Sequence, residues 1–441
     1  MAHLKRTLSL GTLVIFGVGL MTPIIVLGTF GILAQSSDGH VPMAYLAALV
    51  AMLLTAISYA HMAKAFPVSG SSYTYVRKAI DARLGFMTGW AILLDYLFLP
   101  MAIWLIGTAY LNSAFPAVPQ FIWLLAFIAL TTVINILGLK IATAVNVLLL
   151  LVQVLILAAF IALCIHYTLG DPSRPLFTLA PFASGGVQWS MIMSGAAIAC
   201  YSYLGFDAVS TLTEETHDPE RNMPRAILWV TLIGGLIFVG TSYVVQVAQP
   251  SLQFANVDSA AYEIAKNIGG DVFVSIFLIG LVIGQFTSGI AAQASGSRLL
   301  YVLGRDSVLP KGFFGYLSPR FGTPVGCILL SAVVALLALK MDVTTSTSFI
   351  NFGAFLTFIL VNLSVIFHYW IGQKRRGLKA LVLYVLLPLA GMAADLWLMF
   401  SLDANAVELG LSWLAIGFVY LIYLTGGLRR QPPELTLEDA I

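Results

Sequence analysis

The chain has 441 residues, of which 59% are hydrophobic and only 10% are charged, and its mean hydropathy is +0.94. A soluble protein of this length carries about a quarter charged residues to solvate its surface, so this composition excludes an ordinary soluble enzyme, a disordered chain and a disulfide-linked scaffold. The apolar excess runs the whole length of the chain, and a membrane span takes about 20 residues. The sequence therefore predicts an all-α polytopic membrane protein that forms a single domain over residues 1–441.

The N-terminal segment is expected to be the first span rather than a cleaved signal peptide. Lys5 and Arg6 precede an apolar run, as basic residues do in a signal peptide. The run extends from Leu10 to about Phe30 and lacks a cleavage site with small residues at alternate positions. We therefore expect it to be retained.

Apolar runs separated by polar, glycine or proline clusters predict twelve membrane-spanning (TM) helices. In chain order, they cover residues 10–33, 42–65, 84–111, 118–138, 142–167, 187–212, 225–248, 271–303, 323–341, 346–371, 379–401 and 408–427. An even number of spans places both termini on one side of the membrane. Lys and Arg accumulate in cytoplasmic loops, and with the termini inside, the 22 Lys and Arg are all cytoplasmic except Arg174, Lys266 and Lys340. We expect a multi-pass protein of the bacterial inner membrane with both termini in the cytoplasm.

The remaining composition gives no sign of nucleic-acid, redox or metal chemistry. The net charge is only +2 and no basic block is long enough to follow a phosphate backbone, so no nucleic-acid partner is expected. Cys164, Cys200 and Cys327 lie in separate apolar segments without CxxC spacing, and we expect them to pack as small hydrophobic residues. No cofactor and no metal site are predicted.

Two of the spans contain residues that interrupt a helix. The first span contains Gly17, Gly19 and Pro23, and the sixth contains Gly205 followed by Asp207. An interior glycine costs a helix about 1 kcal/mol relative to alanine, and a proline removes a backbone hydrogen bond. Hydrocarbon supplies no water to the freed groups, so a break survives only where it lines a cavity or packs against protein. Close helix packing through small residues is the alternative for either span alone.

The positions of these breaks, in spans 1 and 6, predict two inverted repeats of five helices. The repeats would cover residues 10–167 and 187–371, followed by two accessory helices over 379–427. In such architectures the discontinuous helices meet near the bilayer midplane and form the binding site there.

Three carboxylates fall within predicted spans: Asp95 in span 3, Asp207 in span 6 and Asp395 in span 11. No Lys or Arg is expected at a comparable depth to neutralise them. An unpaired carboxylate near the bilayer centre costs at least ~2.5 kcal/mol on insertion scales. Such a residue is either functional by default or protonated at rest, because burial away from water disfavours its charged form.

The three carboxylates are not equivalent. Asp207 lies in the broken helix itself, where it either contacts substrate or caps the N-terminus of the second half-helix, since anions favour that end. Asp95, in an otherwise apolar span, is expected to contact substrate or a proton. Asp395 lies outside the repeats, and we favour a structural or oligomer contact for it.

A site that contains acids and no bases favours a cationic substrate, which indicates an amine. Proton carriers also need an unpaired acid. Half-helix N-termini with exposed amides, as expected at Gly17–Gly19, instead hold a substrate carboxylate. Both an amine and an amino acid therefore stay open on these residues alone.

Three stretches carry long, ordered motifs. They are Tyr203-Leu204-Gly205-Phe206-Asp207-Ala208-Val209-Ser210-Thr211 with Asp218-Pro219-Glu220-Arg221-Asn222-Met223-Pro224-Arg225, then Ser297-Arg298-Leu299-Leu300-Tyr301 with Gly304-Arg305-Asp306, and Phe66-Pro67-Val68-Ser69-Gly70-Ser71-Ser72-Tyr73. In sequence and placement they resemble the span 6–7, post-span 8 and post-span 2 signatures of the amino acid–polyamine–organocation (APC) superfamily. The resemblance covers nearly the whole chain and implies a LeuT-like transporter fold.

Within that superfamily, residues 38–42, 93–100 and 350–354 resemble the bacterial putrescine importer branch. That likeness implies uptake of a short diamine driven by the proton gradient. The branch carries an acidic residue in span 1 where this chain has Gly28, which weakens the implication for putrescine and makes a monoamine or an amino acid more plausible. Gln153 occupies the span 5 position where some proton-coupled members carry a lysine, so that a carboxylate such as Asp95 or Asp207 would have to take over coupling.

The charged residues of these motifs have more than one explanation. One group falls at the cytoplasmic end of a helix, where it either latches an inward gate or forms a solvated face: Glu214, Glu215, Arg221 and Arg225. A second group, Arg298, Arg305 and Asp306, is expected to anchor topology and helix ends rather than to contact substrate.

Together, the residues and the resemblance predict a secondary active transporter that imports a small cationic amine such as putrescine, coupled to protons; a proton-coupled amino acid permease of the same superfamily is the alternative. The predicted substrate-binding residues are Gly17, Val18, Gly19, Met21, Thr22, Asp95, Tyr96, Tyr203, Gly205, Phe206, Asp207 and Gln285. Coupling is assigned to Asp95, Asp207 and Gln153. A sodium site at Thr287 and Ser288 is the less favoured mode.

Other classes of membrane protein fit less well. A channel would show a repeated polar stripe or a ring-forming filter, and an enzyme would show clustered His, Cys or nucleophile–base pairs; the sequence shows neither. A sensor of amines that shares the transporter fold stays open as an alternative.

Overall fold

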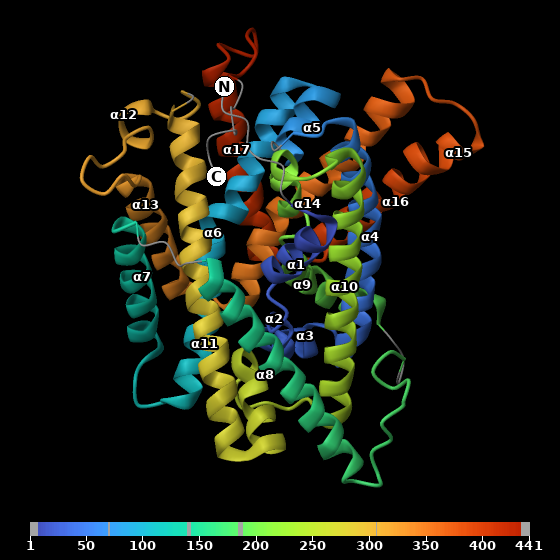
Figure 1. Cartoon of the computed structure of the whole chain (residues 1–441), viewed down its shortest axis with the longest axis vertical. Coiled ribbons are helices and arrows are strands. Elements are labelled where there is room, and N and C mark those ends of the chain that lie inside the picture. The colour runs from blue at the N-terminus through green and yellow to red at the C-terminus, as the bar shows by residue number, and fades with distance from the viewer. Residues whose placement is uncertain (1–7, 69–70, 139–142, 184–187, 306, 434–441) are drawn as a thin grey trace.

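The computed structural model describes residues 8–68, 71–138, 143–183, 188–305 and 307–433 (Figure 1). Within these ranges the chain is helical, and its one strand-like feature is a single parallel bridge between Leu8 and Thr216. Five residues named above lie outside the described residues: Lys5, Arg6, Ser69, Gly70 and Asp306.

The helices follow one another without intervening strands in the described part of the chain. The α-helices are α1 (Leu10–Leu20), α2 (Ile25–Gly28), α3 (Phe30–Ser36), α4 (Val41–Ala65), α5 (Ser71–Ala79), α6 (Ala82–Ala114), α7 (Gln120–Ile136), α8 (Thr143–Leu169), α9 (Trp189–Ala199), α10 (Pro219–Ala248), α11 (Ala260–Arg305), α12 (Lys311–Phe314), α13 (Val325–Ala335), α14 (Val343–Val365), α15 (Leu378–Leu381), α16 (Leu387–Phe400) and α17 (Ala404–Leu424). The 3₁₀ segments are η1 (Cys200–Tyr203), η2 (Ala208–Glu215), η3 (Val257–Ser259) and η4 (Leu336–Lys340). The π-helical segments are η5 (Ile366–Gly372) and η6 (Val382–Leu386).

Among the described residues, ten helical segments are long and apolar enough to cross a membrane, and two further apolar helices, Gln120–Ile136 and Val325–Lys340, are shorter. Each predicted span overlaps one of these segments, so the all-helical membrane architecture is confirmed, whereas twelve crossings and the repeats stay predictions. The main difference concerns the loop predicted over 249–270. Most of its second half is already helical as the start of α11, and the helix kinks at Gly270, where φ is 68°.

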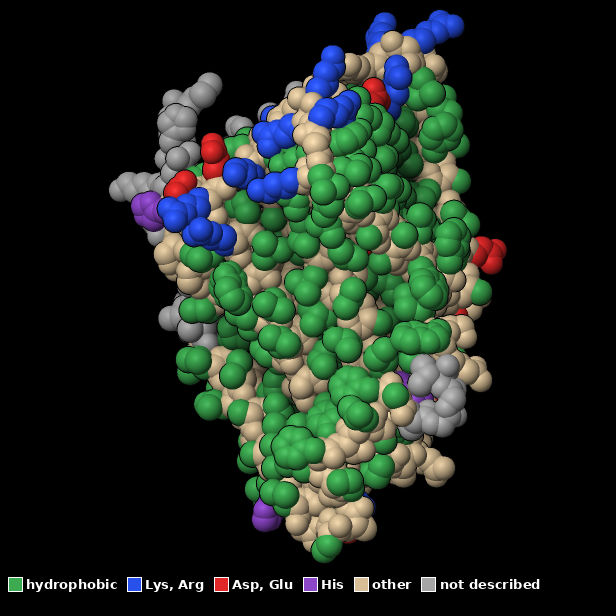
Figure 2. All heavy atoms as spheres, turned by 90° about the vertical axis from the view of Figure 1, so that its right-hand side faces the viewer, with side chains coloured by type: hydrophobic (Ala, Val, Ile, Leu, Met, Phe, Trp, Pro, Cys, Tyr) green, Lys and Arg blue, Asp and Glu red, His purple; other side chains and the backbone are tan. Residues whose placement is uncertain are grey.

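The surface of the molecule is suited to lipid rather than to water. Apolar side chains on α8 are largely exposed, including Leu148 at 58%, Leu151 at 55% and Leu155 at 68%. In Figure 2, hydrophobic side chains cover the middle of the visible face, while Lys and Arg gather at one end. Figure 1 places α5, α12 and α15 at that same end. An apolar belt below a basic end is the distribution expected of a protein that spans a bilayer.

The helix that corresponds to span 1 is interrupted after Leu20. Thr22 adopts a left-handed conformation with φ of 49°, Pro23 has no amide hydrogen to donate, and α2 begins only at Ile25. The interruption therefore lies just after Gly17 and Gly19, which are part of α1 itself. Both glycines allow close packing: a β-carbon at Gly17 would lie 2.5 Å from the Val230 side chain on α10.

The predicted interruption of span 6 is also present. Helix α9 ends at Ala199, the chain continues as η1, and Gly205 then takes φ of 114°, a conformation that side chains other than hydrogen rarely tolerate. The second half of the span, η2, begins at Ala208.

The two interruptions lie against each other. A β-carbon at Gly205 would lie 3.1 Å from Cβ of Leu20 and 3.5 Å from the backbone nitrogen of Met21. The same two segments meet again at the single bridge, where the Leu8 amide donates to the Glu215 carbonyl at 2.9 Å and the His217 amide donates to the Leu8 carbonyl at 3.0 Å. The segment that leads into α1 is thus joined to the end of η2, and Figure 1 shows α1, α2 and α9 in the middle of the bundle.

Gly205→Ala is expected to destabilise the protein by about 1–3 kcal/mol, because the substitution forces a β-carbon into a left-handed conformation beside Leu20. Thermal unfolding of the detergent-purified protein measures this effect. Gly240→Ala is the matched control, because Gly240 lies within α10 and a β-carbon there would meet nothing within 4 Å. Equal melting temperatures for the two variants would contradict the strained, closely packed break at Gly205.

Candidate functional site

Asp207 lies in the interruption of span 6, directly before η2. It occupies the N-cap position of η2, but its side chain makes no capping hydrogen bond to the first turn. The backbone amides of Gly205, Ala208 and Asp207 itself lie beside its carboxylate as donors. The side chain is half-buried. Local amides therefore surround one side of the carboxylate, while the capping bonds expected of a purely structural Asp207 are not made.

Asp95 lies on α6, which packs closely against α11 next to this residue. The carbonyl of the neighbouring residue Tyr96 packs on α11 so closely that a β-carbon at Gly296 would lie 2.3 Å from its oxygen. Helices approach this closely in membranes where the facing residue is small. The Oδ1 atom of Asp95 is buried and has no hydrogen-bond partner among the described residues. A rigid helix thus presents a polar atom whose hydrogen bonding is incomplete.

The two carboxylates are close enough to interact electrostatically. Neither Asp95 nor Asp207 forms an ion pair with a Lys, Arg or His in the part of the chain that the structure describes. Two like charges without a counter-ion repel each other, and a cation placed between them would relieve that repulsion. The structure therefore brings together the two acids that the sequence indicates in spans 3 and 6.

Four tyrosines interact electrostatically with these two acids. Tyr59 on α4, Tyr75 on α5 and Tyr96 on α6 interact with Asp207, and Tyr201 of η1 interacts with Asp95. The hydroxyls of Tyr59 and Tyr75 lie near the side chains of Ser72 and Ser210, respectively. Phenol rings offer a cation both a hydroxyl oxygen and a π face. The surroundings of the acids are aromatic and neutral.

Tyr59 and Tyr75 were not among the site residues predicted from the sequence. Tyr75 belongs to a segment expected to be a cytoplasmic loop, but this segment forms α5, and Tyr75 is fully buried. Helix α5 is joined to η2 by a 2.8 Å hydrogen bond between the hydroxyls of Ser210 and Ser71. The apolar and aromatic residues after Ser71 could have indicated a buried helix. The charged residues that follow them favoured the prediction of a loop instead.

Two of the predicted aromatic residues pack in the interior around this site. Phe206 is fully buried, with its ring centroid 5.5 Å from that of Tyr59 and 5.4 Å from that of Phe358. Tyr203 turns toward α4 and α10: its hydroxyl donates to the Tyr45 carbonyl at 3.0 Å, and its ring meets Phe238. Phe206 therefore belongs to the aromatic cluster next to Asp207, whereas Tyr203 packs toward α4 and α10.

The predicted span 1 residues line or support the break. Val18 and Gly19 are half-buried on α1, and Thr22 is half-buried in the break. Met21 is only 2% exposed and packs on α10, where a β-carbon at Gly234 would lie 2.7 Å from its sulfur. Thr22, whose hydroxyl reaches the Leu20 carbonyl at 3.4 Å, is the polar side chain that this segment offers.

Gln285 is a residue of α11 and faces α2 and α6. It is 3% exposed, and a β-carbon at Gly28 would lie 3.9 Å from its Nε2 atom. A β-carbon at Gly107 on α6 would lie 3.2 Å from Cβ of Gln285. An acidic residue in place of Gly28 would therefore stand beside this amide.

The residues predicted for coupling outside the acid pair lie on the α8–α11 side. Gln153 packs against α11, where a β-carbon at Gly284 would meet its amide at 3.2 Å, and its Oε1 atom has no hydrogen-bond partner in the described ranges. The Thr287 hydroxyl donates to the Ile283 carbonyl of its own helix at 3.0 Å. Ser288 is half-buried on the same helix.

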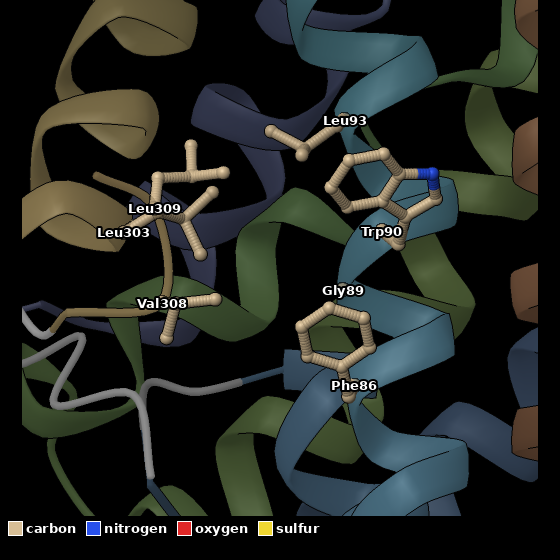
Figure 3. Close-up of a pocket in the computed structure, with 7 residues that line it drawn as sticks. All are labelled: Phe86, Gly89, Trp90, Leu93, Leu303, Val308 and Leu309. Carbon is tan, nitrogen blue, oxygen red and sulfur yellow. The ribbon is translucent and has the colours of Figure 1, made fainter. Parts of the chain in front are cut away.

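Two cavities lie away from the acid pair and are apolar. One of about 10 Å³ is lined by Phe86, Gly89, Trp90, Leu93, Leu303, Val308 and Leu309 (Figure 3). This is about the volume of a single water-sized probe, so it is a packing gap. Another, of about 220 Å³, lies between α8 and α11 among exposed isoleucines and includes Gln153. Neither offers a carboxylate.

Comparison with known proteins adds to this geometry. The family model described as "Amino acid permease" matches residues 11–423. The chain belongs to the amino acid permease family. The low-affinity putrescine importer PlaP of Escherichia coli (strain K12) is 40% identical to this permease over 435 residues, which is 98% of this chain and 96% of that protein.

More distant relatives have other names. The methylthioribose transporter of Bacillus subtilis (strain 168) is 28% identical over 444 residues, covering 95% of this permease and 94% of that protein. The branched-chain amino acid permease BcaP of the same organism is 28% identical over 448 residues, covering 95% and 93%. The resemblance to the APC superfamily is confirmed: the permease is a multi-pass inner-membrane transport protein and not an enzyme.

Asp95→Asn and Asp207→Asn are each expected to leave the melting temperature of the ligand-free permease unchanged or raised. Each substitution removes a carboxylate that lacks a counter-ion and relieves its repulsion with the other. Thermal unfolding of the purified variants measures this, with Glu408→Gln at an exposed position of α17 as the control. A marked fall for Asp207→Asn would instead indicate that this residue stabilises the helix end, as in the capping alternative.

Proposed function

We propose that this permease imports a small aliphatic amine, putrescine or a close relative, across the inner membrane in symport with protons. The observation that carries the proposal is the electrostatic interaction of Asp95 with Asp207, which lies in one of the two meeting helix breaks, without a basic residue paired to either acid in the described part of the chain. The 40% identity to a putrescine importer over nearly the full chain supports the same substrate class.

In this proposal an alkylammonium group sits between the two carboxylates. Asp95 and Asp207 supply charge, and the rings of Tyr59, Tyr96 and Phe206 supply cation–π contacts of about 0.5–2 kcal/mol each. The methylene chain of the amine packs along the apolar residues of the break, such as Met21. The second ammonium of a diamine would point toward the Gln285 side chain.

The proposed topology follows from the same charges. We place both termini and the basic end of the molecule in the cytoplasm, and we count α7 and the α13–η4 segment as crossings, which gives twelve. Residues 10–167 and 187–371 then form inverted repeats around the site, and one group of helices drawn from both repeats would rock against the remaining helices. The link between Leu8 and η2 would make the cytoplasmic halves of both broken helices move together.

Protons are the proposed coupling ion because Asp95 and Asp207 have no basic partner among the described residues. A proton can therefore bind either carboxylate without displacing a fixed positive charge. Sodium is less well supported at Thr287 and Ser288, since the Thr287 hydroxyl is already bonded to its own helix. The alternative function is a proton-coupled amino acid permease. The relatives named as branched-chain amino acid permeases favour it, as does Gly28, which leaves span 1 without an acid.

Uptake of radiolabelled putrescine into proteoliposomes under an imposed pH gradient tests the proposal. Asp95→Asn and Asp207→Asn are each expected to lower the initial rate by about tenfold or more, because each removes one of two charges that bind the ammonium. Glu408→Gln is expected to transport at the wild-type rate. Undiminished uptake in both aspartate variants would rule out this site.

A binding panel separates the amine from the amino acid. Putrescine, agmatine, a monoamine, arginine and alanine are compared by the rise in melting temperature that each causes, because a ligand stabilises the state that it binds. We expect the amines to stabilise the permease. Stabilisation by zwitterions and not by amines would contradict the proposal of an amine importer and support that of an amino acid permease.

A further inference from the structure

Asp395 on α16 is a carboxylate within the membrane-spanning helices that the amine site does not use. It is 0% exposed and lies where α16 packs against α4 and α14. Its Oδ2 atom accepts hydrogen bonds from the Thr55 hydroxyl at 2.8 Å and from Nδ2 of Asn362 at 3.0 Å. Its Oδ1 atom accepts none among the described residues. Among the described residues, Oδ2 thus accepts two hydrogen bonds and Oδ1 accepts none.

This arrangement suits a group that exists in two protonation states. Two donors on Oδ2 stabilise the ionised carboxylate, while the open Oδ1 atom has room for a proton. The Asn362 amide also donates to the Thr55 hydroxyl at 3.1 Å, which leaves the hydroxyl hydrogen for Asp395. A purely structural carboxylate would be expected to have both oxygens bonded.

The groups that face Asp395 are neutral. The titratable side chains that interact with it are Tyr59 on α4 and Cys200 in η1. No Lys, Arg or His pairs with it in the part of the chain that the structure describes. A metal cation is disfavoured here, because the Asn362 side chain turns its NH₂ group, a donor, toward the carboxylate.

Helix α4 connects Asp395 with the amine site. Thr55 and Tyr59 are one helical turn apart and lie on one face of α4. Tyr59 interacts electrostatically with both Asp207 and Asp395, and its hydroxyl lies near the Ser72 side chain of α5. Its ring also contacts Phe206, next to Asp207. Tyr59 is therefore a titratable side chain that interacts with both carboxylates.

We propose that Asp395 stores the proton that is carried together with the amine. The proposal rests on the proposed function. When the ammonium binds, the carboxyl oxygen of Asp207 gives up its proton and Oδ1 of Asp395 takes one up, by way of the Tyr59 hydroxyl, which turns first toward Asp207 to accept a proton and then toward Asp395 to donate one. Asp207 then holds the cation as a carboxylate. After the amine leaves on the cytoplasmic side, the proton returns by the same route and is released from Asp207 into the cytoplasm.

Two transport assays on the same proteoliposomes test this role. Asp395→Asn places an NH₂ group at the Oδ1 position and imitates the protonated acid, so it blocks loading without removing the acceptor for Thr55 and Asn362. Accumulation of putrescine driven by a pH gradient is expected to fall about tenfold more than counterflow of putrescine at equal pH, which needs no net proton movement. Glu408→Gln is the control for both assays.

Equal losses in the two assays would show a structural role and overturn the proposal, as would unchanged accumulation. If Asp395→Asn does not give a monodisperse protein, Thr55→Val replaces it. This variant removes one donor from Oδ2 and makes proton release harder, so the pH profile of accumulation is expected to move to higher pH. An unmoved profile would overturn the proposal. Wild-type protein without any amine counterflow would overturn the proposed substrate instead.

Discussion

The lack of water inside a bilayer is the constraint on which this structure depends. Every backbone group freed by a helix break must find a partner in the protein. Here the break after Leu20 and the break at Gly205 are placed against each other, so that each fills the space that the other opens. The same condition makes an unpaired carboxylate costly. Asp207 in one break and Asp95 on α6 therefore carry an energetic cost, which a bound cation would offset.

The fold could largely be predicted from composition and the length of apolar runs, because these reflect the bilayer directly. Each predicted span overlaps an observed helical segment. The differences arise where the chain is amphipathic. The start of α11 before Gly270 and the helix α5 were expected as loops, because charged residues follow or interrupt their apolar positions. Their helical structure depends on packing against distant segments, which a single sequence does not encode locally.

The acids of the candidate site were predictable and most of their surroundings were not. Asp95 and Asp207 stand out because charge is rare in the spans. Gly17 and Gly19 suggested the break itself, yet they serve close packing, and the interruption begins at Met21. Tyr59 has no unusual neighbours in sequence, and its place near Asp207 follows only from how α4 packs against the interrupted span. Asp395 was expected to make a structural or oligomer contact. Only the structure shows that Thr55 and Asn362 both donate to the same oxygen of its carboxylate.

The central claim is that one cationic amine binds between Asp95 and Asp207 where the two broken helices meet. An experimental structure of the permease with putrescine bound tests it most directly. We expect density for the diamine at this point, with one nitrogen within about 3 Å of a carboxylate oxygen of Asp95 or Asp207. Density for the amine elsewhere in the bundle, or a ligand carboxylate held by the backbone amides of the breaks, would contradict it.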